Sequence, residues 1–371
     1  MCTALLTERL LSLLLASAPL LGPSAPPQAR AAGPDAPLTP AVRDEVIEKC
    51  FAVLRDRYVF PDVAKKMEEA IFERAARNEY DAITSSRVFA DRLTEHLQAV
   101  SHDKHLRVRF QSEPVEEPAA EREPTEADRQ AMRTQEALVN CGFERVERLF
   151  GNVGYLDLRH FAPAEVIADT TAAAFSFLAN TDALIVDLRE NGGGEPGGVA
   201  HVCSYLFGEV PVHLNDIYNR PTGETQQFWT TKVLAGKRYV GKDVYVLTSR
   251  ETFSGAEEFA YNLKNLKRAQ IVGETTGGGA HPGGMHKLAE HFAAFVPDGR
   301  AINPITKSNW EGTGVAPDVD VPASIALKTA HKLALEKLIP ATKEPWLRER
   351  RAELVAELER DIGAKASPSS R

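Results

Sequence analysis

The chain has 371 residues and a formal net charge of −8, with acidic and basic side chains interspersed. This length is enough to bury a large core and to form two structural units. The mixed, mildly acidic charge disfavours a nucleic-acid or polybasic membrane surface, so neither partner is expected. No segment after the first 33 residues is long and apolar enough to span a membrane.

Residues 1–33 differ in composition from the rest of the chain. Residues 10–21 form an apolar stretch too short to cross a bilayer comfortably, and small residues then lead to an A-x-A sequence at 29–31. This order is typical of a secretory signal peptide, so we expect an extracytoplasmic (periplasmic or secreted) protein. Three cysteines would remain after cleavage, which permits at most one internal disulfide, and their spacing indicates no metal site.

Residues 34–110 are predicted to form a helical N-terminal domain. Thr39-Pro40 is typical of a helix cap followed by the first helical residue. Apolar residues then repeat at helical spacing, and the pattern starts again after Pro61 and after Ser86. We therefore expect three packed helices in this part of the chain.

An acidic linker or loop is predicted at 111–140, because residues 111–128 carry glutamates and prolines but few core residues. Residues 141–371 form the second predicted domain. Strand-like and helix-like patterns alternate along it, which indicates a mixed α/β fold, and two helical stretches close the chain. Gly151-Asn152 lies between apolar runs and predicts a β-hairpin.

Ser254 lies in the most informative segment of the chain. Residues 244–247 are an apolar, β-branched run typical of a buried strand, and apolar residues recur at helical spacing from Ala256. Ser254 is therefore expected where a helix begins after a strand and a short loop. The helix dipole and unpaired N–H groups favour negative charge there, which suits a nucleophile. Taken alone, the segment is more typical of an ordinary serine N-cap, because caps are far commoner than nucleophiles.

Three further segments add to this pattern. Residues 184–194 predict another strand that runs into a triple-glycine turn, where backbone N–H groups can approach an anionic atom. Gly193 and Gly255 are thus candidates for the two donors of an oxyanion hole, with Gly194 as the alternative to Gly193. The other two segments are G-E-T-T-G-G-G at 273–279 and W-E-G-T-G-V-A-P-D-V at 310–319.

In this order, the four segments resemble the tail-specific, or C-terminal-processing, family of serine peptidases. The resemblance runs from about Tyr155 to Val321. It is closest to the branch without a PDZ domain, which includes the tricorn core peptidase and the repeats of interphotoreceptor retinoid-binding protein. The resemblance implies a crotonase-like ββα spiral within the α/β domain. It also implies a tail-specific protease that hydrolyses peptides or proteins through an acyl-enzyme on Ser254, with no cofactor.

The base that activates the serine also follows from this resemblance. The PDZ-containing branch uses a lysine after the G-E-x-T segment, and the matching position here is Gly279. The other branch uses a histidine far upstream, in a D-G-H or S-H motif. Aligned on its aspartate, the sequence S-H-D-K-H at 101–105 places His105 on that histidine. Histidine suits this task because its pKa lies near neutrality.

Two other histidines are alternative bases. His102 is selected if the motif is aligned on S-H, and His281 lies close to the place of the missing lysine. A serine–histidine pair also needs a group that orients the histidine or stabilises its charged form. The family places a glutamate just before its G-V-x-P-D segment, and Glu311 is the matching residue.

Two other classes of function compete with a peptidase. The first is a non-catalytic module that binds apolar ligands on the same scaffold, but retention of Ser254, Glu311 and both glycine turns argues against it. The second is a dinucleotide enzyme, because residues 192–197 satisfy G-x-G-x-x-G and Asp216 follows about 20 residues later. Pro196 interrupts that turn, and the motif alone is weak evidence.

Overall fold

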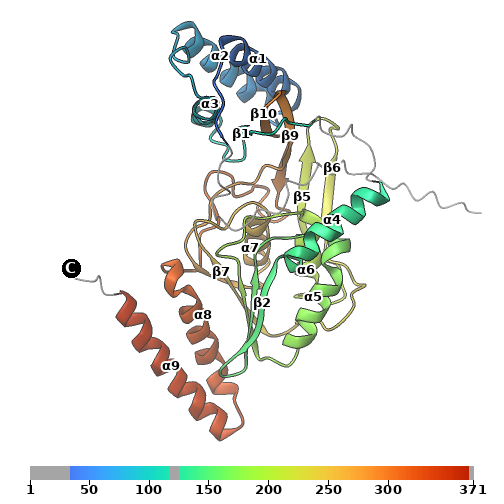
Figure 1. Ribbon diagram of the computed structural model, residues 1–371. Helices are drawn as coiled ribbons and strands as arrows, with labels where there is room; N and C mark the ends of the chain where they lie inside the picture. The colour runs from blue at the N-terminus through green and yellow to red at the C-terminus, as the bar shows by residue number, and fades with distance from the viewer. Residues whose placement is uncertain (1–33, 117–124, 367–371) are drawn as a thin grey trace, which may run out of the picture.

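The computed structural model describes residues 34–116 and 125–366. The predicted signal peptide at 1–33 lies outside the described residues. Within the described ranges, no helix is long and apolar enough to cross a bilayer. Figure 1 shows a group of helices at the N-terminal end, a central mixed sheet, and a pair of helices at the C-terminal end.

The N-terminal unit (residues 34–116) begins with the three expected helices, α1 (Pro40–Arg57), α2 (Pro61–Ala76) and α3 (Ser86–Ser101). Proline occupies the start of α1 and of α2, where the missing N–H is not needed. The side chains of Thr39 and Ser85 cap α1 and α3 by accepting hydrogen bonds from backbone N–H groups. The prediction of three helices is therefore confirmed.

Strands complete the core of this unit. β1 (Arg107–Phe110) pairs antiparallel with β10 (Phe292–Pro297), which pairs with β9 (Gly283–Ala289). The hairpin of β9 and β10 is distant in sequence, yet its apolar side chains share one buried cluster with the helices, as in the edge-to-face contact between Phe89 and Phe292 at 6.1 Å. The three helices therefore bury their apolar faces against a hairpin supplied by the second unit.

The second unit (residues 125–366), here called the catalytic unit, begins with a helix inside the predicted linker. Helix α4 (Glu126–Leu138) starts at a capping box between Thr125 and Asp128, and the short 3-10 turn η1 (Asn140–Gly142) follows it. Glu136 is the one buried residue of α4. The predicted linker or loop at 111–140 is therefore helical over 126–138, where most side chains face solvent.

A six-stranded mixed sheet forms the centre of the catalytic unit, with strand order β12-β8-β7-β4-β3-β2. The first two of these strands in chain order, β2 and β3, form the predicted hairpin at Gly151-Asn152, where both residues have positive φ. The other neighbouring pairs in the sheet are parallel. The strands are β2 (Phe143–Leu149), β3 (Val153–Leu158), β4 (Ala183–Asp187), β7 (Asp243–Thr248), β8 (Gln270–Gly273) and β12 (Val319–Asp320).

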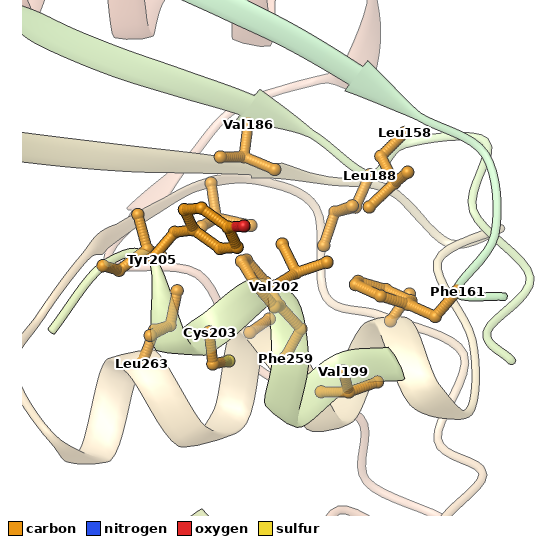
Figure 2. Packing of buried hydrophobic residues seen from close by; sticks show 14 of the residues in the cluster. Leu158, Phe161, Val186, Leu188, Val199, Val202, Cys203, Tyr205, Phe259 and Leu263 are labelled. Carbon is orange, nitrogen blue, oxygen red and sulfur yellow. The ribbon is translucent and has the colours of Figure 1, made fainter. Parts of the chain in front are cut away.

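Helices cover both faces of this sheet. One face packs on α5 (Ala164–Leu178), α6 (Pro196–Ser204) and α7 (Gly255–Asn265), and Figure 2 shows side chains of α6 and α7 packed beneath Val186 of β4. The other face packs on α8 (Ala323–Leu338) and α9 (Pro345–Ala366), which are linked by the turn η2 (Ile339–Ala341). Strands β3, β4 and β7 at the centre of the sheet are buried on both sides, as is usual for parallel strands.

A smaller antiparallel sheet lies beside this layer, with strand order β11-β5-β6. Its strands are β5 (His213–Asn219), β6 (Thr225–Trp229) and β11 (Gly299–Ile302). Cys50, Cys141 and Cys203 are buried free thiols in the described structure, so no disulfide links them.

Candidate active site

Ser254 lies between the end of β7 and the start of α7, in the expected strand–loop–helix setting. Its backbone has φ 52° and ψ −121°. An ordinary N-cap has an extended backbone, as Thr39 and Ser85 have at φ −94° and −99°. A positive φ is unfavourable for serine and persists only where the surroundings impose it, which occurs most often at functional sites. The backbone thus separates Ser254 from a simple cap.

The carboxylate of Glu257 imposes this conformation. The side chain is fully buried, and its oxygens accept hydrogen bonds from the amides of Ser254 at 2.9 Å, Gly278 at 2.6 Å and Gly279 at 2.8 Å. The hydroxyl of Thr276 also donates to it, at 2.5 Å. Burial raises the pKa of Glu257, and these hydrogen bonds oppose that rise. One carboxylate therefore joins the serine backbone to the glycine-rich segment.

Glu257 was not among the residues predicted for the site. A signal for it exists in the sequence, because Ser254 and Glu257 have the spacing of a capping box. That pattern indicates only a helix start. The four donors that converge on the carboxylate come from two separate segments, and only the fold brings them together.

The glycine turn after β4 lies directly against Ser254. A Cβ built on Gly193 would stand 2.7 Å from Ser254 Cβ, so only glycine fits there. The Gly193 N–H donates to the Asn191 side chain at 2.8 Å and is already used. In the described structure, the N–H groups of Gly194 and Gly255 have no acceptor, and a Cβ built on Gly255 would lie 3.1 Å from Gly194 N. This geometry favours Gly194, the alternative donor, over Gly193.

His105 reaches the same place from the N-terminal unit. Its ring lies 4.6 Å from the Phe253 ring and 5.8 Å from the Phe295 ring, measured between centroids. Its Nδ1 is buried without a hydrogen-bond partner among the described residues. Burial lowers the pKa of His105 to about 4, although the nearby Asp103 carboxylate opposes this shift.

The structure leaves no room for a side chain at position 279, where the PDZ-containing branch has its lysine. A Cβ built on Gly279 would lie 2.3 Å from Phe253 Cζ and 2.6 Å from His105 Cε1. The imidazole of His105 and the ring of Phe253 therefore fill the space that a side chain at 279 would need. The Gly279 and Ser254 amides donate to the same oxygen of Glu257, so this space adjoins Ser254.

No hydrogen bond joins the His105 ring to Ser254 within residues 34–116 and 125–366. Such contacts are often long in free enzymes and shorten when substrate binds. His102, the alternative from the same motif, is exposed and ends α3 with φ 57°. The backbone N–H of His102 donates to the carbonyl of Gln98 and so caps the helix, which is a structural role.

His281 lies in a buried cluster with two carboxylates. Its Nδ1 lies 2.8 Å from Asp103 Oδ2 and 3.4 Å from Glu311 Oε2. The Tyr58 hydroxyl donates to Asp103 Oδ2 at 3.3 Å, and the Ala280 amide donates to Glu311 Oε2 at 2.5 Å. Burial, together with the charge of Asp103, raises the pKa of Glu311 to about 7, and His281 lowers it in part.

The structure therefore brings Glu311 to His281 rather than to His105. Donor atoms of Asp103, His281 and Glu311 lie within 4.8 Å of one another, a spacing that a metal ion could bridge. His281 Nδ1 makes a hydrogen bond to Asp103 Oδ2, and its 3.4 Å contact with Glu311 Oε2 is electrostatic. Asp103, which served only to align the sequence motif, is a central member of the cluster.

The fold, with Ser254 at a helix start, is that expected of a serine-peptidase scaffold. Residues 152–321 match peptidase family S41, and residues 39–145 match the N-terminal domain of peptidase S41 in eukaryotic IRBP. The chain belongs to peptidase family S41, a family of serine-type peptidases. The family resemblance seen in the sequence is thus confirmed.

Relatives agree with this assignment. The chain is 28% identical over 179 residues to carboxyl-terminal-processing peptidase 2, chloroplastic, of Arabidopsis thaliana, and the match covers 46% of this chain and 32% of the relative. The match thus spans about a third of the curated relative's length. A lipoprotein from Streptococcus agalactiae has a similar fold, with a TM-score of 0.52 and 13% identity over 81% of this chain and 98% of that one. Mature CPAF also has a similar fold, with a TM-score of 0.51 and 13% identity over 88% of this chain and 99% of that one.

Proposed function

We propose that this chain is a serine peptidase that cleaves peptide bonds through an acyl-enzyme on Ser254. The observation that carries the proposal is the backbone of Ser254, which Glu257 holds at positive φ beside two unpaired amides. A non-catalytic scaffold has no need to maintain such a strained residue. Membership of family S41 supports the same reaction class.

His105 is the proposed general base. It accepts the Oγ proton as Oγ of Ser254 forms a bond to the substrate carbonyl carbon. The resulting tetrahedral intermediate then collapses, the C–N bond breaks, and the leaving amine takes the proton from the His105 imidazolium. Water attacks the acyl-enzyme by the same steps, which releases the new carboxyl terminus and restores Ser254.

The amides of Gly194 and Gly255 are the proposed oxyanion donors. Both are adjacent to Ser254 and carry hydrogens that no described acceptor uses. Preorganised amides stabilise the negative charge that develops on the carbonyl oxygen. A crystal structure with a fluorophosphonate bound to Ser254 tests this. We expect its phosphoryl oxygen about 3 Å from both nitrogens, and placement against Gly193 alone would contradict the assignment.

Ser254→Ala tests the reaction class. We expect it to lower kcat for peptide hydrolysis by about 10⁴-fold or more and to abolish fluorophosphonate labelling, since no acyl-enzyme can form. Thermal unfolding should change little, because the capping carboxylate of Glu257 remains. Ser308→Ala is the matched control, since Ser308 is an exposed serine in the same unit. Full hydrolysis by Ser254→Ala would overturn the proposal, and wild-type protein that neither hydrolyses peptides nor is labelled would favour the apolar-ligand module.

Export from the cytoplasm is also proposed. It is supported by the apolar stretch at 10–21 and the A-x-A sequence at 29–31. Amino-terminal sequencing of the protein from its natural host tests this, with a start just after residue 31 expected. A cytoplasmic protein that retains Met1 would contradict it.

A further inference from the structure

The active site is assembled from two units. The N-terminal unit supplies His105, and the catalytic unit supplies Ser254. The distance between base and nucleophile therefore depends on contacts that cross the boundary between the units. A misplacement of about 1 Å at such a site can cost about 100-fold in rate.

One carboxylate of the N-terminal unit makes two kinds of contact at this boundary. Asp103 Oδ1 accepts a hydrogen bond from the backbone N–H of His105 at 3.0 Å. Its Oδ2 accepts from His281 Nδ1, in the catalytic unit, at 2.8 Å. The Asp103 and His281 side chains are 1% and 6% exposed, so water competes little for these bonds. The loop that carries His105 is thereby fixed to the other unit.

We propose that His281 is a positioning residue that clamps Asp103 and Glu311 together and so holds the His105 loop against Ser254. This inference rests on the proposed function, since it takes His105 as the base. The Nδ1 atom of His281 carries the hydrogen of its bond to Asp103 Oδ2, because an ionised carboxylate only accepts. The clamp joins three segments of the chain, at residues 103, 281 and 311.

The surroundings of His281 explain why a hydrogen-bond donor is needed there. Without it, the Asp103 and Glu311 carboxylates would face each other in a buried place, where like charges repel strongly. The nearby Glu257 carboxylate adds to that repulsion on Glu311. Besides the carboxylates, His105 lies close enough for its charge to interact with that of His281.

An aromatic ring closes the clamp on another side. The Phe60 ring packs edge-on against the His281 ring at 5.3 Å, and the Arg300 guanidinium lies over Phe60 at 5.8 Å. Phe60 belongs to the N-terminal unit, so the His281 imidazole packs against the same unit that carries His105. This packing limits how far the ring of His281 can turn away from the carboxylates.

A pair of amide substitutions separates a clamp from a general base. In His281→Asn the amide nitrogen stands near the place of Nδ1, whereas in His281→Gln it is one bond farther out. Neither side chain can accept a proton as a base at neutral pH. We expect His281→Asn to keep kcat within about tenfold of wild type and His281→Gln to lose about 100-fold, with KM little changed in both.

The matched control is His331→Asn. His331 is buried on the opposite face of the sheet, where its Nε2 lies 2.8 Å from the Phe150 carbonyl. We expect it to change stability but not kcat. Equal, complete loss of kcat in His281→Asn and His281→Gln would overturn the clamp and make His281 the base. Unchanged kcat in both would also overturn it.

Hydrogen exchange tests the clamp without catalysis. In His281→Gln we expect faster exchange of the His105 amide, which Asp103 Oδ1 now protects, and wild-type exchange in His281→Asn. Unaltered exchange in His281→Gln would overturn the clamp even if the protein hydrolyses peptides. Faster exchange in His281→Gln, found together with a wild-type chain that hydrolyses nothing, would leave the clamp standing and overturn the proposed function.

Discussion

His105 and His281 lie near the same glycine, Gly279, but their surroundings differ in kind. His105 stands between the rings of Phe253 and Phe295 and has no partner for its Nδ1 among the described residues. His281 lies between two carboxylates. In a Ser-His-Asp triad one histidine both adjoins the nucleophile and bonds to a carboxylate. Here His105 is the histidine that lies near Ser254, whereas the histidine bonded to a carboxylate is His281.

The apolar surroundings of His105 have a chemical consequence. Burial lowers its pKa to about 4, so the imidazole is neutral and able to accept a proton throughout the neutral range. The imidazolium formed in the proposed attack needs a counter-charge, and Asp103 is the carboxylate that opposes the lowering of the pKa of His105. Asp103 therefore connects the two regions chemically as well as through its hydrogen bonds.

Of these changes, removal of His105 should lower the rate of hydrolysis most. We expect His105→Ala to lower kcat/KM by about 10³- to 10⁴-fold, because no other described group adjoins both Gly279 and Phe253 as a base. The measurement is steady-state hydrolysis of a peptide at pH 7.5, with His102→Ala as control for the same motif. If His105→Ala is active while both His281 variants are dead, the roles of the two histidines are exchanged.

Gly279→Ala should have the next largest effect, because it adds an atom where the two regions meet. The new Cβ would stand 2.3 Å from Phe253 Cζ and 2.6 Å from His105 Cε1. Both rings must shift, so we expect kcat to fall about 100-fold and stability to fall by about 1–3 kcal/mol. Gly192→Ala is the control, since a Cβ there meets nothing within 4 Å. Undiminished kcat in Gly279→Ala would show that His105 does not need its present position.

The pH dependence of stability should also distinguish the two regions, because their expected slopes have opposite signs. His105 has its pKa lowered from 6.5 to about 4, so the unfolded chain takes up this proton first as pH falls. Folding is therefore weakened as pH falls from 6.5 to 4. Glu311 has its pKa raised from 4.5 to about 7, so the unfolded chain loses this proton first, and folding is weakened as pH rises from 4.5 to 7.

Urea unfolding of two variants measures both slopes. Relative to wild type, Glu311→Gln should gain up to about 3 kcal/mol between pH 4.5 and 7, and His105→Asn should gain a similar amount as pH falls from 6.5 to 4. Differences that do not depend on pH would show that the two sites are more hydrated than their burial indicates.

Several features could be predicted because short stretches of chain specify them. The prolines at the starts of α1 and α2, the hairpin at Gly151-Asn152, and the strand, loop and helix around Ser254 all depend on neighbours within a few residues. Helix α4 was missed because nearly all of its residues face solvent, so its composition resembles that of a linker.

The cluster around His281 was out of reach for a different reason. Its members stand at positions 103, 281 and 311, and nothing in the spacing of the chain relates them. The hairpin of β9 and β10 had to dock on the N-terminal helices before Asp103 could meet His281. The sequence also suggested Glu311 as the partner of a catalytic histidine, and only the packed structure shows that the histidine it contacts is His281.

The sequence by itself determined the nucleophile candidate, the glycine turns and the family, because local periodicity and short motifs act over a few residues. Tertiary structure alone decided which amides remain unpaired and which carboxylate bonds to the Ser254 backbone at its positive φ. It also decided that His281, and not His105, contacts Glu311. Those properties depend on burial and on contacts between distant segments, such as those that carry Asp103 and Glu311, which are 208 residues apart. A hydrogen bond within a buried cluster is set by the packing of whole units, and no local pattern encodes it.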